Sequence, residues 1–262
     1  MAFGGWRGSE VLRDDQSERL KPFVPCGRKG PRGPRSDGRR FLDALLWLAP
    51  SGGRWRDLPE DRFGAYQTAK RRYYRWVEQR VFDRMFDAVS ADPDFEWLLI
   101  DATNIRAQAQ AAGARVKRGG AATRALGRSR GGFGTKVHAL VDAIGLPIRI
   151  HPTPGQRGDR PRAETLLAGL KGVGHVIADA AYDADPLRTF IADDLGATAQ
   201  IKANPSRTAK PPIDWRLYKE RHQVECCFNK LKRFRRIALR CEKTITAFMG
   251  LVHLASAMIW LR

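Results

Sequence analysis

The sequence predicts an α/β fold, a mixed sheet flanked by helices and preceded by a small helical domain. Short apolar runs of strand length recur in the second part of the chain, and two of them end in a carboxylate, Asp101 and Asp179. Longer stretches carry apolar residues at helical spacing. Near residues 91–94 a proline marks the change from helical to strand-like patterning, so we predict domains at 1–92 and 93–262.

The composition indicates a globular chain with a polyanionic partner. A length of 262 residues allows one large domain or two small ones, and 43% of the residues are hydrophobic. Lys and Arg number 47 against 28 Asp and Glu, a net charge of +19 that exceeds what solubility requires. No run approaches the roughly 20 apolar residues that span a bilayer, and residues 1–10 lack a signal peptide's apolar stretch. We therefore expect a cytoplasmic protein with no membrane partner.

The first domain is predicted to be helical, with helices over residues 39–49 and 65–89. Ser36 or Asp37 can cap the first helix. Residues 27–38, rich in Gly, Pro and Arg, form either a basic arm or a plain linker. The second helix interleaves basic with aromatic residues, which favours a helix-turn-helix-like DNA-binding domain, although a solvated basic face over a core of aromatic residues explains the pattern equally well. The basic residues of this helix are Lys70, Arg71, Arg72 and Arg75.

The second domain reads as alternating strands and helices. A glycine-rich stretch with seven basic and no acidic residues, 115–136, is predicted to be a mobile basic loop. Strands are predicted at 97–103, 135–141, 146–151, 175–179 and 197–202, and helices at 161–171, 185–195, 214–240 and 243–261.

Four polar residues share one stripe of the predicted helix 214–240. At about 100° per residue, Tyr218, Arg221, Glu225 and Lys232 project within a narrow sector, beside an apolar face. Glu225 should therefore stand at the rim of the core, where a cleft would be. An i, i+4 ion pair would explain Arg221 and Glu225 but not the other two residues.

This stripe carries a resemblance to a known family. The spacing Tyr218-x2-Arg221-x3-Glu225-x6-Lys232 resembles the Y-R-E-K signature of bacterial insertion-sequence transposases of the DDE type, in particular the insertion sequence 5 family. The likeness extends to Gly53-x-Trp55-Arg56-Asp57-Leu58-Pro59, Arg72-x3-Trp76, Asp101-Ala102-Thr103, Gly134-Thr135-Lys136, Thr153-Pro154-Gly155-Gln156, Asp179-Ala180-Ala181-Tyr182-Asp183 and the run from Phe228 to Ala238.

The resemblance implies a ribonuclease-H-like catalytic domain, with Asp101 on the first strand, Asp179 at the end of the fourth and Glu225 on a late helix. Three convergent carboxylates suit two Mg²⁺ ions, with Mn²⁺ as a substitute, because hard cations prefer oxygen ligands. The expected activity is metal-dependent cleavage at transposon ends followed by strand transfer into target DNA, in the manner of cut-and-paste transposition. Arg221 and Lys232 would supply positive charge to the transition state.

The expected partner is double-stranded DNA, both the terminal inverted repeats and the target, bound by a homodimer at synapsis. Arg32 and Arg35 of the arm could enter a minor groove. Further predicted DNA contacts are Lys136 and a basic run after Glu225, namely Lys230, Lys232, Arg233, Arg235, Arg236 and Arg240. Two rival hypotheses are a catalytically inactive, transposase-derived DNA-binding protein and a metal-dependent nuclease that never joins strands.

Overall fold

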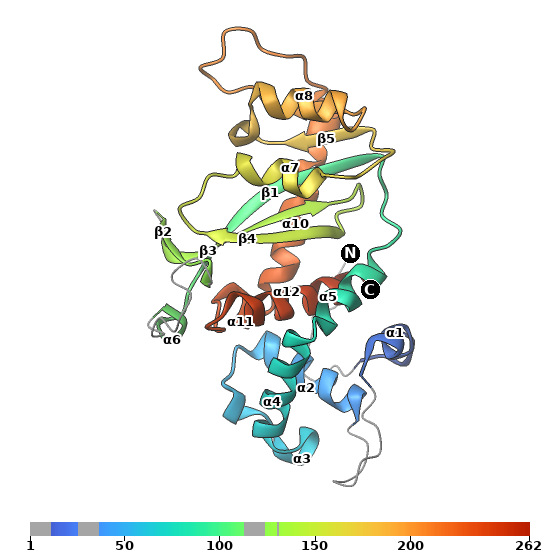
Figure 1. Ribbon diagram of the computed structural model, residues 1–262, viewed down its shortest axis with the longest axis vertical. Coiled ribbons are helices and arrows are strands. Elements are labelled where there is room, and N and C mark those ends of the chain that lie inside the picture. The colour runs from blue at the N-terminus through green and yellow to red at the C-terminus, as the bar shows by residue number, and fades with distance from the viewer. Residues whose placement is uncertain (1–11, 26–36, 113–123, 130) are drawn as a thin grey trace.

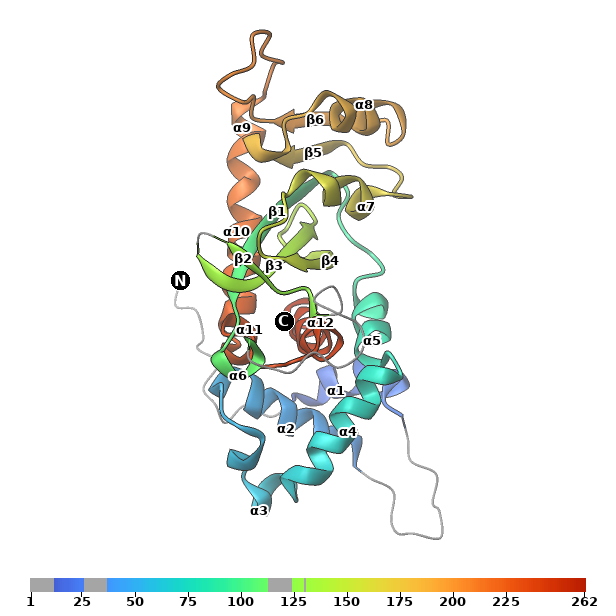
Figure 2. The ribbon, with the colours of Figure 1, turned by 60° about the vertical axis from the view of Figure 1, so that its left-hand side comes forward.

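The computed structural model describes residues 12–25, 37–112, 124–129 and 131–262. A sheet occupies the upper part of the molecule and a group of helices the lower part (Figure 1). Helix α12 (Ile245–Trp260) lies between the two parts and is seen nearly end-on in Figure 2. No helix within the described ranges is both long enough and apolar enough to span a bilayer.

The sheet is mixed and has six strands. Strand β1 lies at its centre, antiparallel to β3 on one side and parallel to β5 on the other. Strand β4 pairs antiparallel with β3, the short β2 pairs with the start of β3, and β6 pairs parallel with β5. This mixed sheet flanked by helices confirms the predicted ribonuclease-H-like fold. The strands are β1 (Trp97–Arg106), β2 (Gly127–Ser129), β3 (Gly132–Val141), β4 (Pro147–Pro154), β5 (His175–Ala178) and β6 (Thr198–Ile201).

The two faces of β1 are both buried, which explains its continuous apolar run. Leu98 and Ile100 pack in one cluster with residues of α7 (Ala163–Leu167) and α8 (Asp185–Asp193). Leu99 lies in the other cluster, with residues of α10 (His222–Lys232) and α12. Because side chains alternate along a strand, Asp101 shares the face of Leu99 and points toward α10.

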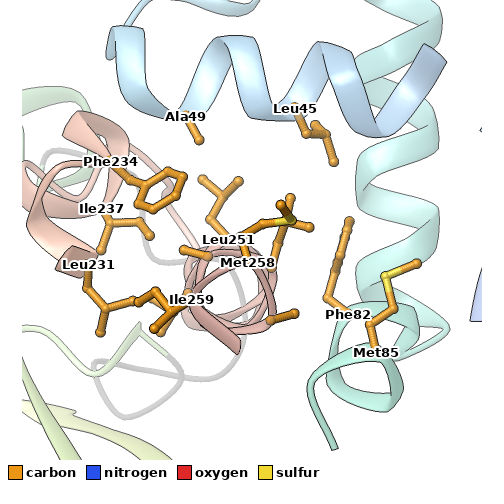
Figure 3. Packing of buried hydrophobic residues seen from close by; sticks show 14 of the residues in the cluster. Leu45, Ala49, Phe82, Met85, Leu231, Phe234, Ile237, Leu251, Met258 and Ile259 are labelled. Atoms are coloured by element: carbon orange, nitrogen blue, oxygen red, sulfur yellow. The ribbon is translucent and has the colours of Figure 1, made fainter. Parts of the chain in front are cut away.

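The predicted helix over residues 214–240 is wrong as one continuous helix. It consists of α9 (Trp215–Tyr218), a 3₁₀ turn η6 (Lys219–Arg221), α10 (His222–Lys232) and, after a break, α11 (Arg235–Ala238). Phe234 adopts an extended conformation at the break, with ψ of 94°. The turn in the chain lets Phe234 and Ile237 pack beside α12 (Figure 3).

The predicted helix over residues 65–89 is also interrupted. It divides into α4 (Tyr66–Glu78) and α5 (Val81–Val89), with Arg80 left-handed at φ 53°. Helix α2 (Gly38–Ser51) matches the predicted helix 39–49, and Asp37 caps it by accepting a hydrogen bond from the backbone N–H of Arg40 at 3.1 Å. The remaining helices are α1 (Asp14–Leu20), α3 (Glu60–Phe63) and α6 (Ala109–Ala112).

Part of the predicted basic loop 115–136 forms β-strands. Its C-terminal part forms β2 and the start of β3, and residues 113–123 lie outside the described residues. Arg240 reaches the backbone just after this gap, where it donates hydrogen bonds to the carbonyls of Arg124 and Ala125. A buried cation therefore holds this end of the segment in place.

Helix α12 joins the helical part to the sheet in one buried core. Leu45 of α2, Phe82 and Met85 of α5, and Met258 of α12 belong to the same cluster (Figure 3). A side chain at Gly250 would meet Val77 and Phe82, so this glycine permits the close approach of α12 to α4 and α5. The division at residue 92 stays a prediction, since the helices on its two sides share this core.

Candidate active site

Asp101 and Asp179 lie side by side where the parallel pairing of β1 and β5 ends, although β1 continues beyond Asp101 in its pairing with β3. The last paired residues of β1 and β5 are Ile100 and Ala178, so the two aspartates directly follow the same register position. The Oδ1 of Asp101 accepts a hydrogen bond from the N–H of Ala102 at 2.7 Å. The Oδ1 of Asp179 accepts one from the N–H of Ala181 at 2.9 Å, as the cap of the turn η5 (Ala180–Tyr182). Each aspartate thus keeps its second oxygen for another partner.

Arg221 links Asp101 to Glu225. Its guanidinium lies 3.2 Å from Oδ2 of Asp101 and 2.5 Å from Oε1 of Glu225. The side chains of Asp101 and Arg221 are 19% and 26% exposed, whereas that of Glu225 is 52% exposed. Arg221 therefore bridges Asp101 of β1 and Glu225 of α10, and the bridge is exposed to solvent at Glu225.

The surroundings of Asp101 shift the pKa of its carboxyl group. Burial raises its pKa to about 6, and the negative charges of Asp179 and Asp159 add to the rise while Arg221 opposes it. Burial also raises the pKa of Tyr218, which the charge of Arg221 lowers and those of Asp179 and Asp101 raise. Tyr218, Arg221 and the two aspartates thus form one electrostatic group.

The donor chemistry of this group fits a divalent cation. Carboxylate oxygens are the ligands that Mg²⁺ prefers, and two of the three acids are adjacent. Within the described residues no three His, Cys, Asp or Glu side chains lie close enough together to hold a metal ion. The guanidinium of Arg221 lies between Glu225 and Asp101 and supplies positive charge there. Asp101, Asp179 and Glu225 are the residues that could hold an ion.

Lys136, predicted to contact DNA, is instead paired inside the protein. Its Nζ lies 2.8 Å from Oδ1 of Asp159, and the two side chains are only 14% and 23% exposed. Asp159 is a fourth acid near the site, which the sequence analysis did not single out. An aspartate in the run Arg157-Gly158-Asp159-Arg160 could have been noticed as the lone acid among arginines.

The basic residues of the first domain divide into two groups. Lys70, Arg71 and Arg75 are exposed on α4. Arg72 is half-buried, donates a hydrogen bond to the carbonyl of Asp37 at 2.8 Å and stacks over the rings of Phe41 and Trp76. Its guanidinium is used within the fold. Arg32 and Arg35 lie outside the described residues.

The basic run after Glu225 also divides. Lys232, Arg233 and Arg235 are exposed, and Lys230 is partly buried. Arg236 is buried, forms an ion pair with Glu242, donates to the carbonyl of Gly53 and lies over the ring of Trp55. Arg240 is wholly buried. The prediction that Arg236 and Arg240 lie along a DNA-binding surface is therefore wrong, because both side chains are buried and bind partners inside the protein.

Comparisons with known proteins agree with these features. Residues 93–260 match the family described as "Transposase DDE domain", and residues 12–86 match "Putative transposase of IS4/5 family". A Brucella ovis protein named "Putative transposase for insertion sequence element IS6501" is 78% identical over 128 residues, which cover 49% of this chain and 98% of that protein. "Uncharacterized protein y4sN" of Sinorhizobium fredii is 60% identical over 114 residues, 44% of this chain and 90% of that protein.

A solved structure, "Mos1 transposase paired-end complex with left transposon end", aligns over 99% of this chain and 88% of its own at 14% identity. Its TM-score of 0.29 is too low to support a conclusion. The match over residues 93–260 covers more than half of the chain and includes all three acids. The chain belongs to the family of transposases with a DDE domain.

Proposed function

We propose that this protein cleaves phosphodiester bonds at the ends of its insertion sequence and joins the freed ends to target DNA. Asp101, Asp179 and Glu225 would hold two Mg²⁺ ions, with Mn²⁺ as a substitute. The observation that carries the proposal is the placement of the acids: Asp101 and Asp179 directly follow the last paired residues of β1 and β5, and Glu225 shares the ion-pair partner Arg221 with Asp101. When bound, a pair of such ions stabilises both the attacking and the leaving oxygen of an in-line displacement.

Arg221 has a place in this proposal beyond pairing with acids. Its guanidinium is partly exposed and contacts two carboxylates that a bound cation would neutralise. Released from them, the guanidinium can donate to two oxygens of a phosphate, a geometry that arginine favours. Lys232 is exposed farther along the same helix and could contact a neighbouring phosphate. Tyr218 lies three residues before Arg221, whose charge lowers the pKa of Tyr218, and we propose that it helps to position the guanidinium.

The DNA is proposed to approach over two basic surfaces. One surface consists of Lys70, Arg71 and Arg75 on α4, where a helix-turn-helix-like role remains our proposal. The other consists of Lys230, Lys232, Arg233 and Arg235 at the end of α10 and the start of α11. Neutralising phosphates with such residues releases counterions and supports binding without regard to sequence. Two ends must meet before joining, so we propose a homodimer in the complex with DNA.

The test is a cleavage and joining assay on a labelled duplex that carries the element's own end. We expect cut and joined products with Mg²⁺, none with EDTA, and none from Glu225→Gln, which keeps the shape of the side chain but loses its charge. Glu78→Gln, at an exposed site on α4, is the matched control and should retain both products.

Each rival hypothesis predicts a different result in this assay. Cut products without joined products would indicate a nuclease that does not transfer strands. Binding without any cut would indicate a DNA-binding protein that has lost its activity. Cleavage by Glu225→Gln at the rate of the unsubstituted protein would overturn the assignment of Glu225.

A further inference from the structure

A pocket lies at the end of β4 and in the loop that follows it, between residues 151 and 162, and we call it the β4 pocket. Its volume of about 480 Å³ falls within the range of about 300–1,000 Å³ that is usual for pockets that bind small molecules. Its lining includes three prolines and two arginines, namely Pro152, Pro154, Pro161, Arg157 and Arg162. The pocket therefore combines apolar and cationic side chains.

The β4 pocket is separate from the acids of the candidate active site. The strand register aligns His151, which lines the pocket, with His138 of β3, and His138 with Ala102 of β1. Ala102 directly follows Asp101, and side chains alternate along a strand, so His151 and Asp101 lie on opposite faces of the sheet. Two strand spacings of about 4.8 Å also separate His151 from β1. A ligand in the pocket would therefore not occupy the carboxylate site.

The two arginines of the pocket are not neutralised within the described part of the chain. The guanidinium groups of Arg157 and Arg162 form no ion pair or hydrogen bond with a described residue, and none of the described residues that line the pocket is an acid. Asp159 lies between the two arginines in the sequence but pairs with Lys136, at 2.8 Å. Guanidinium groups without a carboxylate partner suit a phosphate, whose oxygens they can bind two at a time.

The wall of the pocket also contains a polar atom without a partner. The Nδ1 of His151 is buried and forms no hydrogen bond with a described residue. Burial and the positive charge of Arg162 lower the pKa of His151, so the ring is neutral at neutral pH. A neutral imidazole donates a hydrogen bond at one nitrogen and accepts one at the other. A polar group of a ligand could therefore satisfy this nitrogen.

Close packing fixes the loop that forms the pocket. A side chain at Gly155 would meet the carbonyl oxygens of Gly127 and Gly134, at 3.0 and 3.1 Å, so this glycine lets the loop lie directly against β2 and β3. The N–H of Arg157 donates to the carbonyl of Pro154 at 2.9 Å. The pocket is thus formed before any ligand binds, as small-molecule sites usually are.

We propose that the β4 pocket binds one nucleotide of a DNA strand, with its phosphate on Arg157 and Arg162 and its base against the prolines. His151 exchanges one hydrogen bond with the base or the sugar. DNA is the source of the nucleotide because the chain carries a net charge of +19 and belongs to a transposase family. The inference rests on the proposed function only in taking DNA as the partner, and it requires nothing of the three acids.

The experiment measures the affinity of the full chain for a labelled single-stranded oligonucleotide, by fluorescence anisotropy in EDTA. Arg162→Gln removes one cation of the pocket. Arg160→Gln is the matched control, because Arg160 is exposed in the same 3₁₀ turn, η4 (Arg160–Arg162), and does not line the pocket. Both variants lose one positive charge, so a difference between them reports the pocket and not the net charge.

A third variant fills the pocket without changing the charge. Gly158 lines the pocket, and a Cβ added there would meet only Cδ of Pro161, at 4.0 Å. The backbone at Gly158 is not left-handed, so Gly158→Leu introduces no strain at this position. Thermal unfolding of the three variants should match that of the unsubstituted protein, because none of them removes a contact within the fold.

We expect Arg162→Gln to weaken binding of the oligonucleotide about 10- to 100-fold, the factor that corresponds to a hydrogen bond to a charged group. Gly158→Leu should weaken it at least as much, because the base can no longer enter. Arg160→Gln should weaken it less than about fivefold, the upper range for an exposed charge pair. The free nucleotide dAMP should displace the oligonucleotide at a lower concentration than inorganic phosphate does.

Four outcomes would overturn the inference. Equal weakening by Arg160→Gln and Arg162→Gln would show that only net charge acts, and unchanged binding by Gly158→Leu would show that the pocket stays empty. Equal competition by inorganic phosphate and dAMP would leave an anion site without a place for the base. Variants that lose affinity for dAMP and keep it for the oligonucleotide would make a free nucleotide the ligand.

Failure of this inference is distinguishable from failure of the proposed function. Binding is measured without metal, so inactive acids would leave the result in place. Conversely, an empty pocket would leave cleavage and joining as they are. If the unsubstituted protein binds no oligonucleotide at all, DNA is not its partner and both fail.

Discussion

Two of the clusters in which an arginine meets a carboxylate differ in what surrounds them. At the corner between α11 and α12, the side chains of Arg236 and Glu242 are only 6% and 2% exposed, and Tyr74 donates to the second oxygen of Glu242. At the candidate active site, Arg221 bridges Asp101 to a Glu225 that is half exposed. An enclosed pair fixes the fold, while an open one can exchange its partner for a ligand.

The corner also contains a second buried cation, Arg240, which forms no ion pair with a carboxylate of the described residues. Arg240 is 0% exposed, and burial lowers its pKa to about 10. It donates to the carbonyl of Ala125 at 3.2 Å and to the hydroxyl of Thr135, and it lies over the ring of Phe248. Its hydrogen bonds join the segment between α11 and α12 to β3 and to the residues just before β2. Charge in this corner therefore serves to connect segments that are far apart in the sequence.

The largest effect, on the free energy of unfolding, is expected from breaking the buried ion pair of Arg236 and Glu242. Glu242→Gln would leave the guanidinium of Arg236 buried without its counterion, which typically costs about 3–5 kcal/mol. Denaturant unfolding of the full chain measures this change in the free energy of unfolding. Glu78→Gln, at an exposed position, should change it by less than about 0.5 kcal/mol. Equal stability of the two variants would contradict the contrast between the corner and the active site.

Substitution of Arg221, which forms the exposed ion pair with Glu225, should change the activity of the protein and not its stability. Arg221→Gln removes the charge that we propose to act on phosphate, and cleavage should fall on the order of 10²–10³-fold, as when one donor to a developing charge is lost. Mn²⁺ affinity should not fall, since the guanidinium no longer competes for Asp101 and Glu225. Rates of cleavage and calorimetric titration measure the two effects. A variant with weaker Mn²⁺ binding would show that Arg221 supports the metal site.

The smallest expected effect is on the pH dependence of stability, and it comes from Asp101 at the candidate active site. In the metal-free protein the pKa of Asp101 is about 6, above the value of about 3.9 for an unfolded chain. Between these values the folded state keeps a proton that the unfolded state loses, so stability decreases as the pH rises from about 4 to about 6.

Asp101→Asn should remove this loss. Its gain in the free energy of unfolding should reach at most about 3 kcal/mol at pH 8, because a difference of about two in pKa corresponds to that energy. At pH 4 the gain should nearly vanish. Denaturant unfolding in EDTA at the two pH values provides the measurement, and an equal gain at both would contradict the raised pKa.

Local patterns in the sequence predicted much of the sheet and its order along the chain. The apolar runs before Asp101 and Asp179 could be recognised because strands buried on both faces are continuously apolar. The breaks at Arg80 and Phe234 could not be predicted, since packing against α12 decides them and not local propensity. The predicted joint role of Asp101, Asp179 and Glu225 stays a prediction about chemistry, although the structure shows how Arg221 links two of them.

Charge alone could not separate structural arginines from exposed ones. Arg72, Arg236 and Arg240 look like their basic neighbours in the sequence, but their partners lie far away along the chain, at Asp37, Gly53 and Ala125. Asp159 was missed for a related reason. Its pairing with Lys136 depends on how the segment after β4 folds back over the sheet, which no local pattern records.

The position of α12 has a consequence for how the protein is made. Helices α2, α4 and α5 leave the ribosome with their apolar faces uncovered, because α12, which covers them, is synthesised much later. The side chains of Arg13 and Gln16 must likewise wait for the carbonyl of Leu261, to which both donate. These helices can therefore complete their core only after α12 has left the ribosome, and a truncation before α12 would leave their apolar faces exposed to proteases and aggregation.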